Sequence, residues 1–194
     1  MNNHNLMSAI VIDTNDPDKL GRVLITLPAL PEGPELWARV VSPLAGGDRG
    51  FCLLPEIGDE VLAAFTPGDL SCAYVLGGLW GKQKAPPEGL GGEENNQKML
   101  RTRSGHTMTF DDTDGKEKIT LTDKNGNSIE ISTKDDRVTI KAKSKLEIKT
   151  DGDMALSGKT IKLSANTIEL TSDSSLTLDG GGTAELKAGT VNIN

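Results

Sequence analysis

Few residues of this chain have side chains of the kind that catalysis or metal binding requires. The 194 residues include two histidines, His4 and His106, and two cysteines, Cys52 and Cys72. A zinc-type site takes roughly three or four protein ligands, so His106 is expected to pack or to form a hydrogen bond rather than to hold a metal. Two cysteines are too few for a disulfide framework, and we expect both to be reduced, buried thiols.

Two acidic clusters have spacings that resemble a calcium loop, DDTDG (Asp111–Gly115) and DKNGN (Asp123–Asn127). Neither is followed by the Glu that supplies the last, bidentate ligand of such a loop. Asp, Asn and Gly are also the residues of tight hairpin turns, and we prefer this interpretation to calcium binding. The glycine-rich stretches EGLGGEE and DGGGTAE lack the Lys-Ser/Thr of a phosphate-binding loop. The sequence predicts no catalytic residues, no metal and no cofactor, and therefore no enzyme.

The composition narrows the function classes further. Hydrophobic residues make up 36% of the chain and aromatic residues 3%, and the formal net charge is −7. An acidic chain is poorly suited to bind nucleic acid, because phosphate neutralisation requires clustered Lys and Arg. The N-terminus lacks the basic and apolar stretches of a signal peptide, and no apolar run approaches the roughly 20 residues of a membrane span. We therefore expect synthesis in the cytoplasm without a signal peptide.

The first half of the chain is typical of a small all-β barrel. Runs rich in Val, Leu, Ile and aromatic residues alternate with turns that contain Gly and Pro. Five such strands fit the Greek-key barrel of the OB fold, with Trp37 and Phe51 packed in the barrel or at a subunit contact. The predicted strands are Arg22–Leu27, Trp37–Val41, Gly50–Pro55, Glu60–Phe65 and Cys72–Trp80.

A Pro-, Gly- and Glu-rich stretch, GKQKAPPEGLGGEENNQK, follows the barrel and has the composition of a linker. The predicted organisation is an OB-fold barrel in residues 1–82, a linker in residues 83–98 and a β-helical needle in residues 99–194.

The second half of the chain is an internal repeat. Eleven apolar pairs recur, each with one residue between its two members (polar in all but Met154/Leu156), and the step between pairs shortens from 11 residues to 7 or 8. Such regularity identifies a repeat architecture. The pairs are Met108/Phe110, Ile119/Leu121, Ile129/Ile131, Val138/Ile140, Leu146/Ile148, Met154/Leu156, Ile161/Leu163, Ile168/Leu170, Leu176/Leu178, Ala184/Leu186 and Val191/Ile193.

Each repeat supplies only one narrow apolar face, because alternate residues of a strand point to opposite sides. A single-chain meander of such strands would leave this face in water and its edges open. The prediction is an intertwined homotrimer, a triple-stranded β-helix in which each strand bonds to strands of the other chains and the pairs meet on the axis. The needle core is then represented by Ile161, Leu163, Ile168, Leu170, Leu176 and Leu178.

Several motifs of the first half resemble a known family. They are DP…LGRV (Asp16–Val23), WARV (Trp37–Val40), G…LPEIGDEV (Gly50–Val61) and VLG (Val75–Gly77). In these the chain resembles contractile-tail spike proteins, namely the baseplate assembly protein V family of phages and the valine-glycine repeat proteins of type VI secretion. The resemblance implies a homotrimeric spike whose barrel docks on the tail hub and whose needle points at the target membrane. The linker is too short for the lysozyme domain that some members insert.

The resemblance also implies a partner at the needle tip. Some members bind iron there through a His-x-His element, which KAGTVNIN lacks. The remaining possibilities are a small tip protein of the proline-alanine-alanine-arginine repeat family, or a terminus that frays in solvent. The expected contact residues for a tip protein are Val191, Asn192, Ile193 and Asn194.

The sequence therefore predicts the central spike of a contractile injection machine or phage-tail baseplate, which assembles in the cytoplasm, becomes part of a tail-like particle and pierces the target cell envelope. The alternative is a trimeric adhesin or tail-fibre module, in which the barrel binds a ligand and the needle is a stalk. A weaker rival is a monomeric single-chain β-solenoid enzyme, which would need an acidic or histidine-rich cleft on one solenoid face.

Overall fold

The computed structural model describes residues 6–192. All regular secondary structure in this range is β-strand and no helix occurs in it, which agrees with the all-β prediction. The chain divides into two units, one that runs through Lys145 and one that begins at Leu146.

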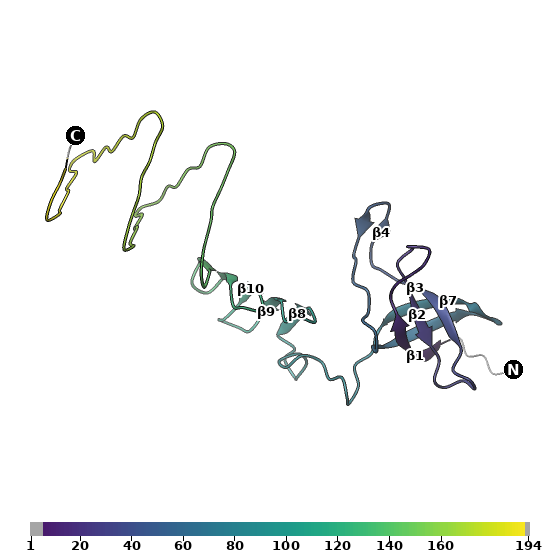
Figure 1. Ribbon diagram of the computed structural model, residues 1–194. Coiled ribbons are helices and arrows are strands. Elements are labelled where there is room, and N and C mark those ends of the chain that lie inside the picture. Colours follow the sequence, from purple (N-terminus) through teal and green to yellow (C-terminus); the bar gives the residue numbers. More distant parts are fainter. Residues whose placement is uncertain (1–5, 193–194) are drawn as a thin grey trace. The chain divides into compact units, whose positions relative to one another are not determined.

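Five strands of the first unit close into a barrel (Figure 1). They are β1 (Leu6–Asp13), β2 (Arg22–Thr26), β3 (Glu35–Val40), β6 (Glu60–Thr66) and β7 (Asp69–Gly78). The order around the barrel is β1-β2-β3-β7-β6, and β6 pairs back to β1. All neighbours are antiparallel except β3 and β7, which are parallel. A closed five-stranded barrel of this kind is consistent with the predicted OB fold.

The barrel core follows from the alternation of its strands. Inward positions carry small or medium apolar side chains, while the residues between them face out. The interior of a five-stranded barrel is narrow, which suits Ala and Val better than aromatic rings. The core consists of Met7, Ala9, Val11, Val23, Ile25, Leu27, Ala38, Val61, Ala63, Phe65, Ala73 and Val75.

One predicted barrel strand is wrong. Within Gly50–Pro55 only the first residue is in a strand, because the short strand β5 (Arg49–Gly50) pairs with β4 (Ala45–Gly46) and the remaining residues pair with no strand. The run FCLLP is apolar at successive positions and so has no single inward face. The fifth barrel strand is β1, which the sequence analysis did not identify. Phe51 is accordingly 58% exposed rather than part of the core.

A second sheet follows the barrel in sequence. It consists of β8 (Gln97–Arg101), β9 (Thr107–Asp111), β10 (Lys118–Thr122), β11 (Ser128–Ser132) and β12 (Arg137–Lys141). Each strand pairs antiparallel with the next, so that the sheet is a meander in simple chain order. Short turns with Gly at positive φ, such as Gly115 and Gly126, reverse the chain between strands, as such tight turns require.

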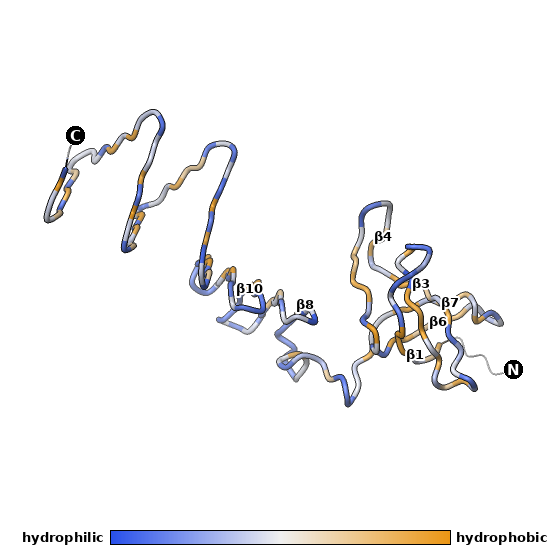
Figure 2. The backbone as a smooth tube through the Cα atoms, viewed as in Figure 1, coloured by the Kyte–Doolittle hydropathy of each residue, from blue (hydrophilic) through white to orange (hydrophobic). Residues whose placement is uncertain are grey.

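The second unit is extended in a different way. From residue 142 to residue 192 the chain runs in straight segments separated by bends, and none of these described residues belongs to a strand. Figure 2 shows that apolar and polar residues alternate along these segments. All residues from 146 to 192 are exposed, so this unit has no core of its own.

Replacing Ile25 by Ala is expected to lower the free energy of unfolding by about 2–5 kcal/mol, because it leaves a cavity at a fully buried position. Phe51→Ala is the control, since an exposed side chain far from special features is expected to contribute within about 0.5 kcal/mol. Urea unfolding followed by tryptophan fluorescence measures both changes. Equal losses of stability in the two variants would contradict the position of Phe51 outside the core.

Candidate functional site

The sheet β8–β12 aligns its apolar residues in two rows. In the register of the ladders, Phe110 lies opposite Ile119 and Met108 opposite Leu121. Residues directly opposite one another in a ladder share a face of the sheet, so the two rows lie side by side on one face. We call this the apolar sheet face. Its rows are Phe110, Ile119, Ile131 and Val138, and Leu100, Met108, Leu121, Ile129 and Ile140.

The apolar sheet face is uncovered in the single chain. Its side chains are between 40% (Met108) and 65% (Val138) exposed. The opposite face of the same strands carries mostly Thr, Ser and charged side chains. Monomeric soluble proteins rarely expose a contiguous apolar patch of more than a few hundred Å², so this face has the character of an assembly surface.

The pairing within this sheet corrects one prediction. The strands between Gln97 and Lys141 bond to neighbours of the same chain, whereas we expected every needle strand to bond to strands of other chains. The physical reason is the length of the connections. Steps of about ten residues leave room for a five-residue strand and a hairpin turn, so antiparallel pairing within the chain is available there.

The predicted needle-core residues lie in the second unit, and the structure does not bring them together. Exposure of these six side chains ranges from 52% for Ile168 to 78% for Leu178. In the described part of this unit no ladder joins one apolar pair to the next. Their role as a core therefore stays a prediction, which requires partners outside this chain.

The two acidic clusters are turns, as predicted. In the first, Oδ1 of Asp111 accepts hydrogen bonds from the backbone N–H and the hydroxyl of Thr113, at 3.0 and 2.6 Å. In the second, Oδ1 of Asp123 accepts from the backbone N–H groups of Asn125 and Asn127, at 2.8 and 2.9 Å. The Thr113 hydroxyl is the main cause of a lowered pKa at Asp111. The Asn127 side-chain amide, which donates to Oδ2 at 2.7 Å, is the main cause of a lowered pKa at Asp123, and the backbone N–H groups add to both. Among residues 6–192 no group of three His, Cys, Asp or Glu side chains is placed to hold a metal ion.

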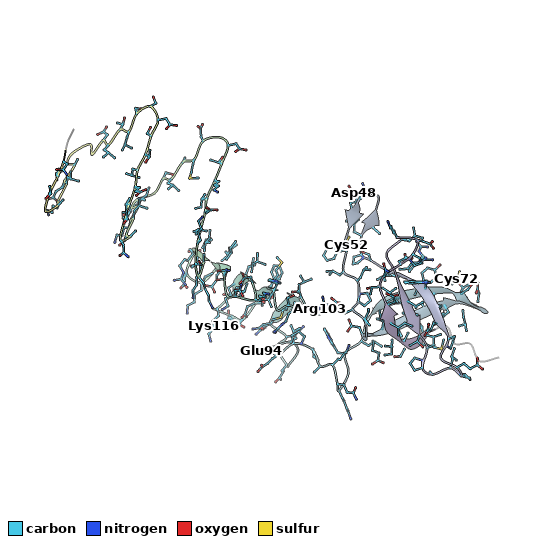
Figure 3. The ribbon with its side chains drawn as sticks, viewed as in Figure 1. Asp48, Cys52, Cys72, Glu94, Arg103 and Lys116 are labelled. Carbon is cyan, nitrogen blue, oxygen red and sulfur yellow. The ribbon has the colours of Figure 1, made fainter. Side chains whose placement is uncertain are left out.

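The remaining candidate residues have mixed outcomes. His106 Nδ1 accepts a hydrogen bond from the backbone N–H of Lys124 at 3.4 Å, in line with a structural role. Cys52 and Cys72 are both free thiols, but both are exposed (Figure 3), so the prediction that they are buried is wrong. Val191 and Asn192 are exposed. His4, Ile193 and Asn194 lie outside the described residues, and the tip contact stays a prediction.

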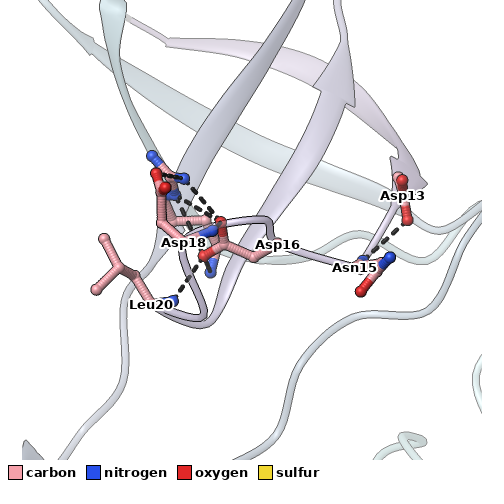
Figure 4. A network of polar contacts seen from close by, with 6 residues as sticks. Asp13, Asn15, Asp16, Asp18 and Leu20 are labelled. Atoms are coloured by element: carbon pink, nitrogen blue, oxygen red, sulfur yellow. Dashed lines mark hydrogen bonds and ion pairs between the residues drawn. The ribbon is translucent and has the colours of Figure 1, made fainter.

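A polar network that was not predicted from the sequence lies at Asp16, in the loop between β1 and β2 (Figure 4). The carboxylate accepts backbone N–H bonds from Asp18, Leu20 and Arg22 and forms an ion pair with the Arg22 guanidinium at 2.7 Å. The Asp16 side chain is only 4% exposed. Arg22 also lies over the ring of Trp37, 5.7 Å from its centroid. Asp16 therefore fixes the turn that aligns β2, and the motif Asp16–Val23 is the only sequence signal for it.

A turn between residues 56 and 59 is bonded to Lys84, at the start of the predicted linker. Lys84 Nζ donates to the carbonyl of Gly58 at 2.7 Å and pairs with the Asp59 carboxylate at 3.0 Å. Asp59 Oδ2 in turn accepts from the backbone N–H of Glu56. The predicted motif LPEIGDEV thus contains the residues that hold the first residues of the linker.

The described chain contains no helix long and apolar enough to cross a membrane.

Comparison with known proteins gives a consistent result for the barrel. Residues 7–80 match the type VI secretion system/phage-baseplate injector OB domain. The chain is 33% identical over 114 residues to the actin cross-linking toxin VgrG1 of Vibrio cholerae serotype O1, an alignment that covers 54% of this chain and 10% of the toxin. It is 27% identical over 114 residues to the type VI secretion system spike protein VgrG3 of the same species, with 54% and 11% covered. The chain thus spans about a tenth of the length of these curated relatives.

Asp16→Asn is expected to destabilise the barrel in a pH-dependent manner. The Arg22 guanidinium, with the backbone N–H groups around it, holds the pKa of Asp16 well below its ordinary value of 3.8. A depressed pKa in the folded state means that the stabilisation is complete above about pH 4 and is lost as the pH falls toward the folded-state pKa. The difference in Tm between wild type and variant should therefore be largest at neutral pH and should shrink progressively as the pH falls from about 4 toward the folded-state pKa.

Asp48→Asn, at the exposed hairpin of β4 and β5 (Figure 3), is the control and should show no such dependence. A Tm difference for Asp16→Asn that persists unchanged at pH 2.5 would show that the charge of Asp16 is unimportant.

Proposed function

We propose that the chain is a structural subunit of the central spike of a contractile injector, because residues 7–80 match the type VI secretion system/phage-baseplate injector OB domain. In this role three copies assemble, the barrel forms the end that docks on the tail hub, and the residues after it form the shaft that enters the target envelope. The named spike protein among its relatives supports the proposal.

The observation that carries the proposal is the uncovered apolar surface of the residues that follow the OB domain in sequence. Nine apolar side chains of the sheet lie in two rows on one face, and the pairs between Leu146 and Leu186 continue the same spacing, with all their side chains exposed. Burial of apolar surface stabilises by about 25 cal/mol per Å². Three such faces that turn toward a common axis would cover one another, which one face cannot do alone.

A structural role agrees with the chemistry of the described residues. The acidic side chains with lowered pKa values, such as Asp111 and Asp123, are engaged in turns. One relative is named as a toxin, but the alignment covers only 10% of that protein, and its activity is not assigned to this chain. We therefore propose that this chain transmits force rather than catalyses a reaction.

The rivals receive less support. A monomeric β-solenoid enzyme requires strands that stack within one chain, and the described residues 142–192 contain none. An adhesin would share the shaft but use the barrel to bind a ligand at the outer end, so the direction of the chain in the particle separates it from a spike.

The oligomeric state is the first test. We expect light scattering of the purified protein to give three times the chain mass of 20.6 kDa, because the apolar sheet face needs partners. A monodisperse monomer would refute the spike assembly.

Leu170→Asp and Thr171→Asp form a matched pair for the second test. Both positions are exposed in the single chain, so without assembly the two changes should be equally harmless. In the assembled shaft Leu170→Asp would bury a carboxylate from each copy at a cost of several kcal/mol, whereas Thr171→Asp, on the outer face, should change stability by no more than about 0.5 kcal/mol. Thermal melting and light scattering measure both, and identical behaviour would refute the assigned face.

A further inference from the structure

The barrel contains a pocket that the spike role leaves unexplained. The parallel strands β3 and β7 pair at only two positions, Arg39 opposite Tyr74 and Val40 opposite Val75. The parts of both strands that precede these positions are not paired with each other, and a pocket of about 580 Å³ is lined from both of them. We call it the seam pocket. Its lining includes Leu20, Trp37, Arg39, Ala45, Cys72 and Tyr74.

Two arginines stack on aromatic rings at the seam pocket. The Arg22 guanidinium lies 5.7 Å from the centroid of the Trp37 ring, and that of Arg39 lies 5.9 Å from the Tyr74 ring. Arg22 and Arg39 are also direct partners in the ladder between β2 and β3. Like charges directly opposite one another destabilise a sheet, so this arrangement favours bound anions.

Within residues 6–192, only one of these two guanidinium groups has an acidic partner. Arg22 forms ion pairs with Asp16 and Asp18 at 2.7 and 2.5 Å. Arg39 is exposed, and within residues 6–192 it forms no hydrogen bond or ion pair. Acidic side chains outnumber basic ones by 11 to 6 in residues 1–90, yet none of the described ones pairs with Arg39. The Arg39 guanidinium lies against the Tyr74 ring at the pocket wall, with its N–H groups available as hydrogen-bond donors.

We propose that the seam pocket is a docking site for an extended, acidic segment of a partner protein. A carboxylate of this segment pairs with the fork of the Arg39 guanidinium, a geometry that arginine provides and lysine does not. The backbone of the segment lies along the unpaired parts of β3 and β7, as in strand addition to an open sheet edge. Apolar neighbours of the carboxylate pack against Leu20 and Trp37.

The open strands and the apolar wall distinguish this occupant from a small anion. Inorganic phosphate would satisfy Arg39 but would leave the unpaired strand parts and the Leu20 and Trp37 side chains uncovered. An extended segment covers all three. The proposal concerns the barrel alone and does not depend on the oligomeric state of the shaft.

Tryptophan fluorescence of the full-length chain provides a direct test. The chain has two tryptophans, and Trp80 is 70% exposed, so Trp80→Phe leaves Trp37 as the reporter in the pocket. The probe is a short peptide of alternating Thr and Val with one central Glu, and its control has Gln at that position. We expect saturable quenching by the Glu peptide and binding about tenfold weaker for the Gln peptide, because the charged hydrogen bonds are lost.

Two arginine variants sharpen the test. Arg39→Gln in the same background should weaken binding of the Glu peptide about tenfold, whereas Arg101→Gln, an exposed arginine on β8, should leave it unchanged. A thiol reagent gives a second readout, since bound peptide should slow the modification of Cys72 in the pocket and not of Cys52 outside it.

The proposal is overturned if binding of the Glu peptide is not saturable, or if the Glu and Gln peptides bind equally well. It is also overturned if Arg39→Gln binds the Glu peptide as tightly as the protein with Arg39 does, or if inorganic phosphate at the same ionic strength gives an identical response. If copies of the chain already cover the pocket, Cys72 will be unreactive and the Glu peptide will not bind, which also overturns it.

Discussion

The second half of the molecule is governed by one constraint: each repeat places two apolar side chains on one face, and nothing in the described residues 6–192 covers that face. In the meander, neighbouring strands shield these side chains laterally, and Phe110 and Ile119 are still 40% exposed. Beyond Lys141 even this lateral cover is missing, and Leu178 reaches 78%. Because conformational entropy opposes order at every residue, an ordered shaft requires that other chains supply the buried surface.

The barrel, by contrast, buries its apolar side chains and pairs its strands within one chain. Its sheet closes, so that apart from the diverging β3 and β7 it leaves no free edge, and its core is filled by side chains as small as Ala9 and Ala63. Its polar groups are also used internally: Asp16 takes up three backbone N–H groups and a guanidinium in a single loop. One chain thus combines a barrel with its own core and a segment whose apolar side chains are exposed, a combination that is consistent with the proposed spike subunit.

The sequence predicted the barrel strands where alternation and turn residues agree, as in Arg22–Leu27 and Glu60–Phe65. It failed for β1, where no strand was predicted within the barrel region, and for Gly50–Pro55, whose apolar residues lie in an exposed loop rather than in a barrel strand. The apolar pairs predicted which residues share a face, but not that β8–β12 pair within the chain, because a repeat spacing does not identify the partner strand. Internal pairing ends after Val138 and Ile140, where the step between pairs falls from nine to eight residues. Polar networks such as that of Asp16 depend on loop geometry. The sequence therefore showed the motif Asp16–Val23 but not the hydrogen bonds that its residues form.

The simple chain order of the meander has a kinetic consequence. Its ladder partners are close in sequence, as in Thr122 opposite Ser128 and Ser132 opposite Arg137. Loops of this length close within roughly 10–100 ns and hairpins form in about 1–10 μs, well before separate chains at ordinary concentrations meet. Each chain therefore brings five strands already in register to any encounter. A misaligned association would have to displace a whole sheet by a full strand spacing of about 4.8 Å, so few alternative alignments compete. In the proposed assembly, the slow step would then be the meeting of chains, whose rate rises with protein concentration, and not the search for strand pairs.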